Sequence, residues 1–107
     1  MAATVASLHF QQAGHLRLEG LELLKAFRGL TTHETALGVP IFANTQDMEG
    51  LAVIAEKRLK GSPLGFGFLL AGHGLYAWGH DAADTVRHLD AFDYLFTLVL
   101  KLKGIPV

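Results

Sequence analysis

Residues 65 to 79 read Gly65-Phe-Gly-Phe-Leu-Leu-Ala-Gly-His-Gly-Leu-Tyr-Ala-Trp-Gly79, two apolar segments separated by Gly72, His73 and Gly74. Apolar segments of this length, bounded by glycines and rich in aromatic residues, predict two β-strands. Their short connection fits either a hairpin or one strand that continues through a kink. In both cases the His73 imidazole lies on a bare, tight backbone that a metal ion or a substrate could approach closely.

His73 is therefore a candidate metal ligand, although one ligand does not make a site. A catalytic zinc ion normally takes three protein donors and keeps a fourth position open. From spacing alone, the simpler interpretation is a turn histidine that hydrogen-bonds its neighbours, because a lone histidine is a weak signal. No other histidine pairs with a second one at a spacing such as His-x-x-x-His. We interpret these others as surface or loop residues: His9, His15, His33, His80 and His88.

The composition restricts the class of protein. The chain has 107 residues, 50% of them hydrophobic, a formal net charge of -1 and no cysteine. This length predicts a single domain over residues 1–107. The balanced charge argues against a nucleic-acid partner, and the lack of cysteine excludes disulfides, thiolate metal sites and cysteine nucleophiles.

No segment has the pattern of an export signal or a membrane span. The N-terminal residues lack the basic start and apolar run of a signal peptide. The longest apolar runs are far shorter than the roughly 20 residues that cross a bilayer. We therefore expect a soluble protein with no membrane partner, located in the cytoplasm.

Two elements are predicted in the first half of the chain. Residues 16–27 carry leucines at helical spacing, positions 18, 21 and 24, and predict a helix that ends at Gly29. Residues 39–42, Val-Pro-Ile-Phe, predict a short strand. Pro40 cannot donate to a ladder, so it favours an edge strand or the start of a strand.

A second helix is predicted after this strand. Asn44, Thr45 and Asp47 form a helix-start signal, and the sequence 61–63, Gly-Ser-Pro, marks the end. The face expected to be buried consists of Leu51, Ile54, Ala55 and Leu59.

Asp81 predicts the N-cap of a last helix that runs to about Lys103. We expect Asp84 to meet Arg87 or His88 on its outer face. The expected apolar line is Val86, Leu89, Phe92, Phe96 and Val99, and the aromatic cluster Phe92, Tyr94 and Phe96 is interpreted as packing. The complete order, helix, strand, helix, strand, strand, helix, predicts an α/β or α+β fold in which helices cover a sheet.

Four segments together resemble the methylthioribulose-1-phosphate dehydratases of the class II aldolase and adducin superfamily. They are residues 18–25 (Leu-Glu-Gly-Leu-Glu-Leu-Leu-Lys), 31–34 (Thr-Thr-His-Glu), 39–47 (Val-Pro-Ile-Phe-Ala-Asn-Thr-Gln-Asp) and 73–79 (His-Gly-Leu-Tyr-Ala-Trp-Gly). The resemblance covers nearly the whole chain. It implies a partial three-layer αβα domain with a mostly antiparallel sheet.

The resemblance also implies residue roles. His73 corresponds to the third histidine ligand of a catalytic zinc ion, one per subunit, and Glu22 to the general acid/base, with Glu19 as the nearby competitor. The family reaction is the loss of water from 5-methylthioribulose 1-phosphate, which gives a 2,3-diketo-5-methylthiopentyl 1-phosphate in methionine salvage. The substrate is thus a sugar phosphate, and the complete enzyme is expected to be a homotetramer with sites near subunit contacts.

Two departures from the family pattern matter. Relatives carry the first two zinc ligands in a His-x-His-Ser motif upstream of the point that matches residues 2–6, so the chain resembles the C-terminal half of such an enzyme. We therefore expect residues 1–107 alone to bind zinc poorly. Ala71 also replaces an arginine that relatives often have two residues before the histidine, which removes one expected anion contact.

Two alternative functions stay open. The first is aldol cleavage or epimerisation of a sugar phosphate, which uses the same metal-stabilised enediolate. The second is a non-catalytic fragment or assembly module, which would expose apolar strand and helix faces. Tyr76 and Trp78 lie two residues apart, so on a strand they share a face, and we interpret them as core residues.

Overall fold

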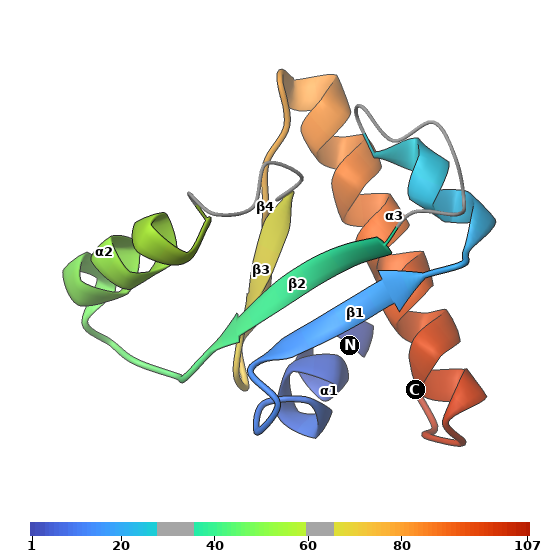
Figure 1. Ribbon diagram of the computed structural model, residues 1–107, viewed down its shortest axis with the longest axis horizontal. Helices are drawn as coiled ribbons and strands as arrows, with labels where there is room; N and C mark the ends of the chain where they lie inside the picture. Colours follow the sequence, from blue (N-terminus) through green and yellow to red (C-terminus); the bar gives the residue numbers. More distant parts are fainter. Residues whose placement is uncertain (28–35, 60–65) are drawn as a thin grey trace.

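A computed structural model describes residues 1–27, 36–59 and 66–107 (Figure 1). Within these ranges the elements are α1 (Ala2–His9), β1 (His15–Glu19), the 3-10 helix η1 (Glu22–Ala26), β2 (Ala36–Phe42), α2 (Met48–Leu59), β3 (Gly67–Leu70), β4 (Gly74–Ala77) and α3 (Ala82–Leu102). The chain therefore has an α+β fold, as predicted. The predicted loop at Thr31, Thr32 and His33 lies outside the described residues.

The four described strands form one mixed sheet in the order β1-β2-β3-β4. β1 pairs antiparallel with β2, and β3 pairs antiparallel with β4. β2 and β3 are parallel, with Ile41 opposite Leu69, and α2 lies in the crossover between them. Two of the three pairings are antiparallel, which confirms the expected mostly antiparallel sheet.

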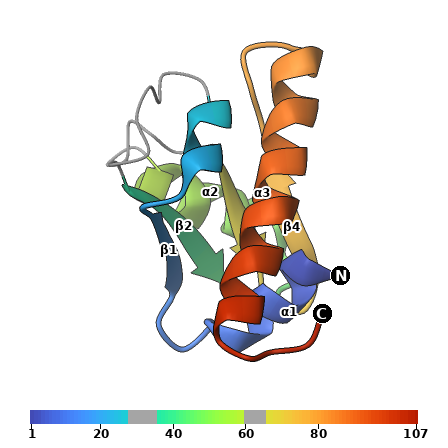
Figure 2. The same cartoon turned by 90° about the vertical axis from the view of Figure 1, so that its right-hand side faces the viewer.

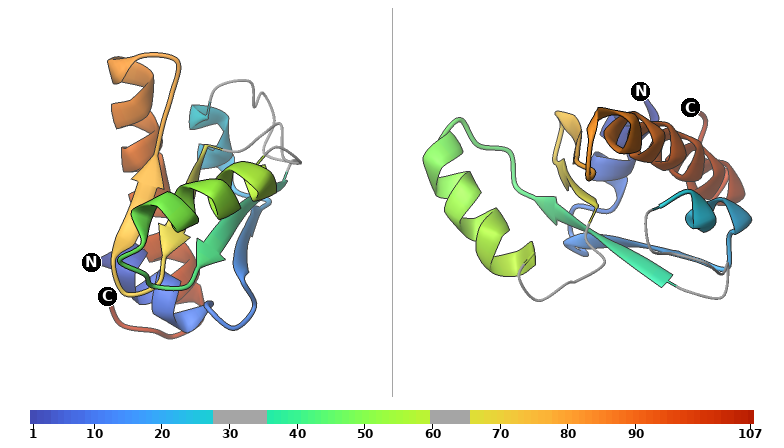
Figure 3. Two further views of the ribbon diagram at one scale, coloured as in Figure 1. Left: turned by 90° about the vertical axis from the view of Figure 1, so that its left-hand side faces the viewer. Right: turned by 90° about the horizontal axis from the view of Figure 1, so that it is seen from above.

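Helices lie on both faces of the sheet (Figures 2 and 3). Because side chains alternate along a strand, Val39 and Leu69 point to one face and Phe42 and Leu70 to the other. The first face packs against α1, η1 and α3 in the main core, which includes Leu16, Leu18, Leu24, Phe27, Phe92, Leu95 and Phe96. The second face forms a smaller cluster, in which Leu51 and Ala55 of α2 cover Phe42 and Leu70.

Residues 16–27 do not form the predicted helix. Leu16 and Leu18 are buried and Arg17 between them is exposed, which is the two-residue period of a strand. Gly20 has a positive φ of 69° and ends β1, and only the short η1 follows. The leucine spacing is compatible with both structures, but pairing with β2 along all of β1 buries both leucines in the sheet. The expected stop at Gly29 lies outside the described residues.

Pro40 lies inside an inner strand, neither in an edge strand nor at a strand start as predicted. β2 has β1 on one side and β3 on the other, and Pro40 is the fifth of its seven residues. The N–H of Ile41 donates to Gly14 beside β1 at 2.9 Å, so the nitrogen of Pro40 faces β3. The pairing of β2 with β3 starts only at Ile41. The missing N–H of Pro40 therefore removes no hydrogen bond from either ladder.

α2 confirms the second predicted helix. Asp47 precedes it and accepts the N–H of Gly50 at 3.0 Å, as the helix-start signal predicted. Leu51 and Ala55 are buried, but Ile54 is 57% exposed, because α2 touches the sheet along only one narrow ridge. The side chain of Leu59 and the predicted end at residues 61–63 lie outside the described parts of the chain.

α3 confirms the last helix and its N-cap, since Asp81 Oδ1 accepts the N–H of Asp84 at 2.8 Å. Its buried face is rotated from the predicted one: Val86 is 57% exposed and Leu89 is 38% exposed. The buried residues of α3 are Asp84, His88, Ala91, Phe92, Leu95, Phe96 and Leu100. No helix among the described residues is long and apolar enough to cross a membrane.

Candidate functional site

The connection between β3 and β4 is a tight hairpin turn, which decides between the two predicted alternatives. Ala71, Gly72 and His73 join Leu70 to its ladder partner Gly74. Gly72 has a φ of 79° and Gly74 a φ of 131°, values that residues with a side chain rarely adopt. The His73 N–H donates to the Leu70 carbonyl at 2.9 Å, and the His73 side chain is exposed. The turn thus presents the imidazole to solvent.

α1 holds this turn from one side, as Figure 1 shows near the N-terminus. Ser7 is fully buried, and its Oγ accepts the N–H of Gly72 at 3.1 Å. The same hydroxyl donates to the carbonyl of Thr4 at 2.7 Å. Thr4 Oγ1 donates to the His73 carbonyl over a longer 3.5 Å. The backbone on both sides of the Gly72–His73 peptide bond is therefore attached to α1.

Glu22, the predicted general acid/base, does not lie beside His73 within one chain. It is the first residue of η1, and its side chain is outside the described part of the structure. Figures 1 and 2 show η1 in the upper part of the molecule and the β3–β4 turn beside α1 in the lower part. The competitor Glu19 is exposed on β1, where its Oε2 accepts a hydrogen bond from Arg17 Nε at 3.1 Å.

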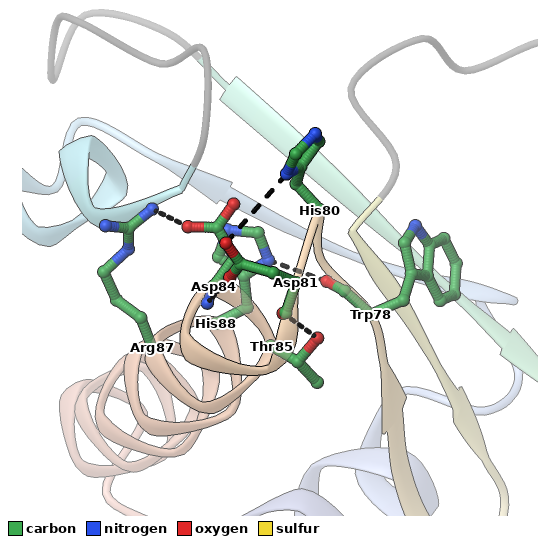
Figure 4. Close-up of polar contacts among 7 residues, drawn as sticks. All are labelled: Trp78, His80, Asp81, Asp84, Thr85, Arg87 and His88. Carbon is green, nitrogen blue, oxygen red and sulfur yellow. Dashed lines mark hydrogen bonds and ion pairs between the residues drawn. The ribbon is translucent and has the colours of Figure 1, made fainter.

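Another group of possible metal ligands does come together among the described residues. His80, Asp81 and Asp84 have ligand atoms within 4.8 Å of one another (Figure 4). Asp81 already caps α3, and Asp84 Oδ1 accepts a 2.7 Å hydrogen bond from Arg87. His80 Nδ1 is 4.0 Å from Asp81 Oδ2. The predicted Asp84–Arg87 pair therefore forms, but Asp84 is buried and does not lie on the outer face as predicted.

This second group is separate from the His73 turn. His73 precedes β4 and His80 follows it. Figure 1 shows that β4 runs from the turn beside α1 toward the start of α3, so the two histidines flank opposite ends of this strand. Among the described residues, the group of possible ligands around His80 does not include His73.

His88 is buried, so its interpretation as a surface or loop residue is wrong. It has 0% exposure, and its Nδ1 is 2.7 Å from the carbonyl oxygen of Trp78. Its ring packs against Phe27 and Phe66, with ring centroids 5.3 Å and 4.9 Å away. The sequence does contain a signal for this position, because residue 88 lies four before Phe92, on the same helix face.

Three other histidines are exposed, as predicted: His9, His15 and His80. His33 lies outside the described residues.

Tyr76 and Trp78 share a strand face, since both rings pack beside Phe68, with centroids 5.2 Å and 6.3 Å from it. They are not core residues, however, because they are 41% and 38% exposed. α2 covers only part of that face. On α3, Phe92 and Phe96 are buried, whereas Tyr94 is 59% exposed.

Comparison with known families gives one match that covers most of the chain. The family described as Class II Aldolase and Adducin N-terminal domain matches residues 1–100. The match includes α1, the whole sheet, η1, α2 and most of α3. The His73 turn and Glu22 both fall within it.

Curated relatives carry a more specific name. The methylthioribulose-1-phosphate dehydratase of Parvibaculum lavamentivorans is 51% identical over 100 residues, which cover 94% of this chain and 49% of the relative. Enzymes of the same name from Xanthomonas campestris pv. campestris (strain 8004) and Stenotrophomonas maltophilia (strain K279a) are 54% and 52% identical, over 92% and 94% of this chain. These matches cover 45% and 46% of the two relatives. The chain thus spans about half the length of the curated relatives it matches.

Proposed function

Because the chain belongs to the class II aldolase and adducin family, we propose that it forms part of a methylthioribulose-1-phosphate dehydratase. The reaction would remove water from 5-methylthioribulose 1-phosphate to give a 2,3-diketo-5-methylthiopentyl 1-phosphate, a step of methionine salvage. The main support is identity of 51% to 54% to enzymes of that name across nearly the whole chain. Location in the cytoplasm stays a prediction.

The cofactor in this proposal is Zn²⁺, with His73 as one ligand. An imidazole nitrogen is an ordinary zinc donor, and the exposed His73 side chain on its glycine-flanked turn is accessible to an ion. The turn supplies one donor, and the one group of three possible donors found in the described ranges does not include His73. We therefore propose that the remaining ligands lie outside the described residues, in the part of the protein that corresponds to the unmatched half of the relatives.

Glu22 is the proposed acid/base. Bound zinc would polarise the oxygens next to the acidic carbon of the substrate. A carboxylate can accept the proton from that carbon and later deliver a proton to the leaving hydroxyl. Since η1 and the His73 turn lie at opposite ends of one chain, we propose that Glu22 of one subunit serves His73 of another. This arrangement agrees with the proposed homotetramer with sites near subunit contacts.

The proposal is tested on the chain expressed together with the coding sequence that precedes it. Product formation from 5-methylthioribulose 1-phosphate and zinc content are measured together. We expect Glu22→Gln to keep zinc and to lower kcat by roughly 10²–10⁴-fold, the usual contribution of a general acid/base. Glu19→Gln is the matched control, because Glu19 lies in an exposed ion pair with Arg17. Aldol cleavage of the substrate without diketone formation would contradict the dehydratase assignment.

A further inference from the structure

Ser7 is a buried polar side chain that the proposed chemistry does not use. It is 0% exposed, yet it lies on α1 and reaches a turn 65 residues further along the chain. A hydroxyl can donate one hydrogen bond and can also accept hydrogen bonds. The Ser7 hydroxyl does both: it accepts from the Gly72 N–H and donates to the Thr4 carbonyl. The bond within α1 fixes the direction of the hydroxyl, which leaves its lone pair aimed at Gly72.

Another hydrogen bond ties the turn to a distant element: the N–H of Ala71, at its start, donates to the Phe42 carbonyl of β2 at 2.9 Å. The peptide groups of Gly72 and His73 follow the end of β3, and the His73 N–H bond to Leu70 is internal to the turn. A residue flanked by two glycines has a backbone that resists reorientation weakly. The contact of Thr4 with the His73 carbonyl is long, at 3.5 Å. Ser7 therefore supplies the shorter of the two hydrogen bonds that tie this turn to α1.

We propose that Ser7 is a positioning residue for His73: its hydroxyl fixes the Gly72–His73 backbone against α1 and so fixes where the imidazole stands. The inference rests on the proposed role of His73 as a zinc ligand. Metal ligands from separate segments must lie within a few tenths of an ångström of the positions that the coordination geometry requires. A turn that moves relative to α1 would therefore weaken zinc binding. Ser7 does not touch metal or substrate in this proposal.

The first test measures the turn itself in the 107-residue chain. We expect Ser7→Ala to speed hydrogen exchange of the Gly72 amide by roughly fivefold to tenfold, the loss of one hydrogen bond of ordinary net strength. The NMR order parameters of residues 71–73 should fall in parallel. The exchange of the Phe10 amide, which bonds to Ala6 in α1, should not change.

Thr97→Ala is the matched control. Thr97 Oγ1 donates to the Asp93 carbonyl at 2.8 Å, which is the same kind of side-chain bond within a helix, and this bond lies within α3 and does not reach the turn. The variant should leave the exchange rate of the Gly72 amide unchanged, because it removes only a bond within α3. Equal Gly72 exchange in wild type and Ser7→Ala would overturn the proposal.

The second test measures zinc per chain by metal analysis in the protein that includes the preceding coding sequence. Ser7→Ala should require roughly tenfold more free zinc for half occupancy, and Thr97→Ala should match the wild type. If Ser7→Ala binds zinc as tightly as wild type, Ser7 does not position the ligand. If the His73→Ala variant binds zinc as tightly as wild type, the proposed function fails instead. The exchange rate of the Gly72 amide then still decides whether Ser7 holds the turn.

Discussion

Gly72 and Gly74 explain how the proposed ligand His73 is exposed on a very short turn. A three-residue connection between paired strands requires backbone angles that a side chain disfavours, and both glycines adopt them. His73 itself keeps a negative φ, because no described residue other than glycine has a positive one. The strain of the turn is therefore carried by residues without side chains, and the imidazole is free to face a ligand.

At the residue scale, Gly74→Ala should destabilise the fold. A Cβ there would meet only Thr4 Oγ1, at an ordinary 3.6 Å, so the cost comes from the φ of 131°. We expect a loss of about 1–3 kcal/mol in the free energy of unfolding. Gly38→Ala on β2 is the control, since its Cβ has open space and its φ is not positive. That variant should be unchanged or up to about 1 kcal/mol more stable. Urea denaturation measures both, and equal stabilities would refute this account of the turn.

At the scale of elements, the rotated face of α3 places His88 in the core. His88 joins α3 to the end of β4 through the Trp78 carbonyl and packs against both Phe27 and Phe66. It thereby connects the segment after η1 with the segment before β3. A buried, hydrogen-bonded histidine at such a junction is explained by structure alone and needs no metal.

His88→Ala should therefore lower the free energy of unfolding by about 2–4 kcal/mol, through a cavity and an unpaired Trp78 carbonyl. Val86→Ala, two residues earlier and 57% exposed, should change it by less than about 0.5 kcal/mol. Thermal or chemical denaturation compares the two. A larger loss of stability in Val86→Ala than in His88→Ala would contradict this account and support the buried helix face that was predicted from the sequence.

Sequence patterns predicted α2, α3 with its Asp81 cap, and two strands on either side of His73, because each carries a local signal such as a cap, a period or bounding glycines. They did not decide between a hairpin and a kinked strand at His73, which the ladder between β3 and β4 settles. They failed where local signals conflict. The spacing of Leu16 and Leu18 fits a strand, whereas that of Leu18, Leu21 and Leu24 fits a helix. Only the pairing with β2 shows that the first part of this segment is the strand β1. His88 was missed because its four-residue spacing to Phe92 indicates the helix face but does not show what would satisfy a buried imidazole. Its partner, the Trp78 carbonyl, is ten residues away. The role of Glu22 came from family position alone.

At the scale of the whole molecule, the fold separates the two proposed functional residues. The His73 turn lies beside α1 at one end and η1 lies at the other (Figure 1). A site that uses both residues must then combine two copies of the chain, which a closed symmetric oligomer provides.

Subunit mixing tests this arrangement. His73→Ala and Glu22→Gln chains are each expected to be inactive in the protein with its preceding sequence. Mixed in equal amounts and reassembled, they should recover about a quarter of wild-type turnover, since one site in four then combines an intact His73 with an intact Glu22. Each variant reassembled alone is the control. No recovery in the mixture would place both residues in the same chain's site.

The central claim, that His73 is a zinc ligand, is tested most directly by metal content. Zinc per chain is measured in the protein with its preceding sequence for wild type, His73→Ala and His80→Ala. His80 is the matched control because it is an exposed histidine in the separate group with Asp81 and Asp84. The account predicts about one zinc ion per chain in wild type and His80→Ala, and almost none in His73→Ala. Full zinc content in His73→Ala, or its loss in His80→Ala alone, would contradict it.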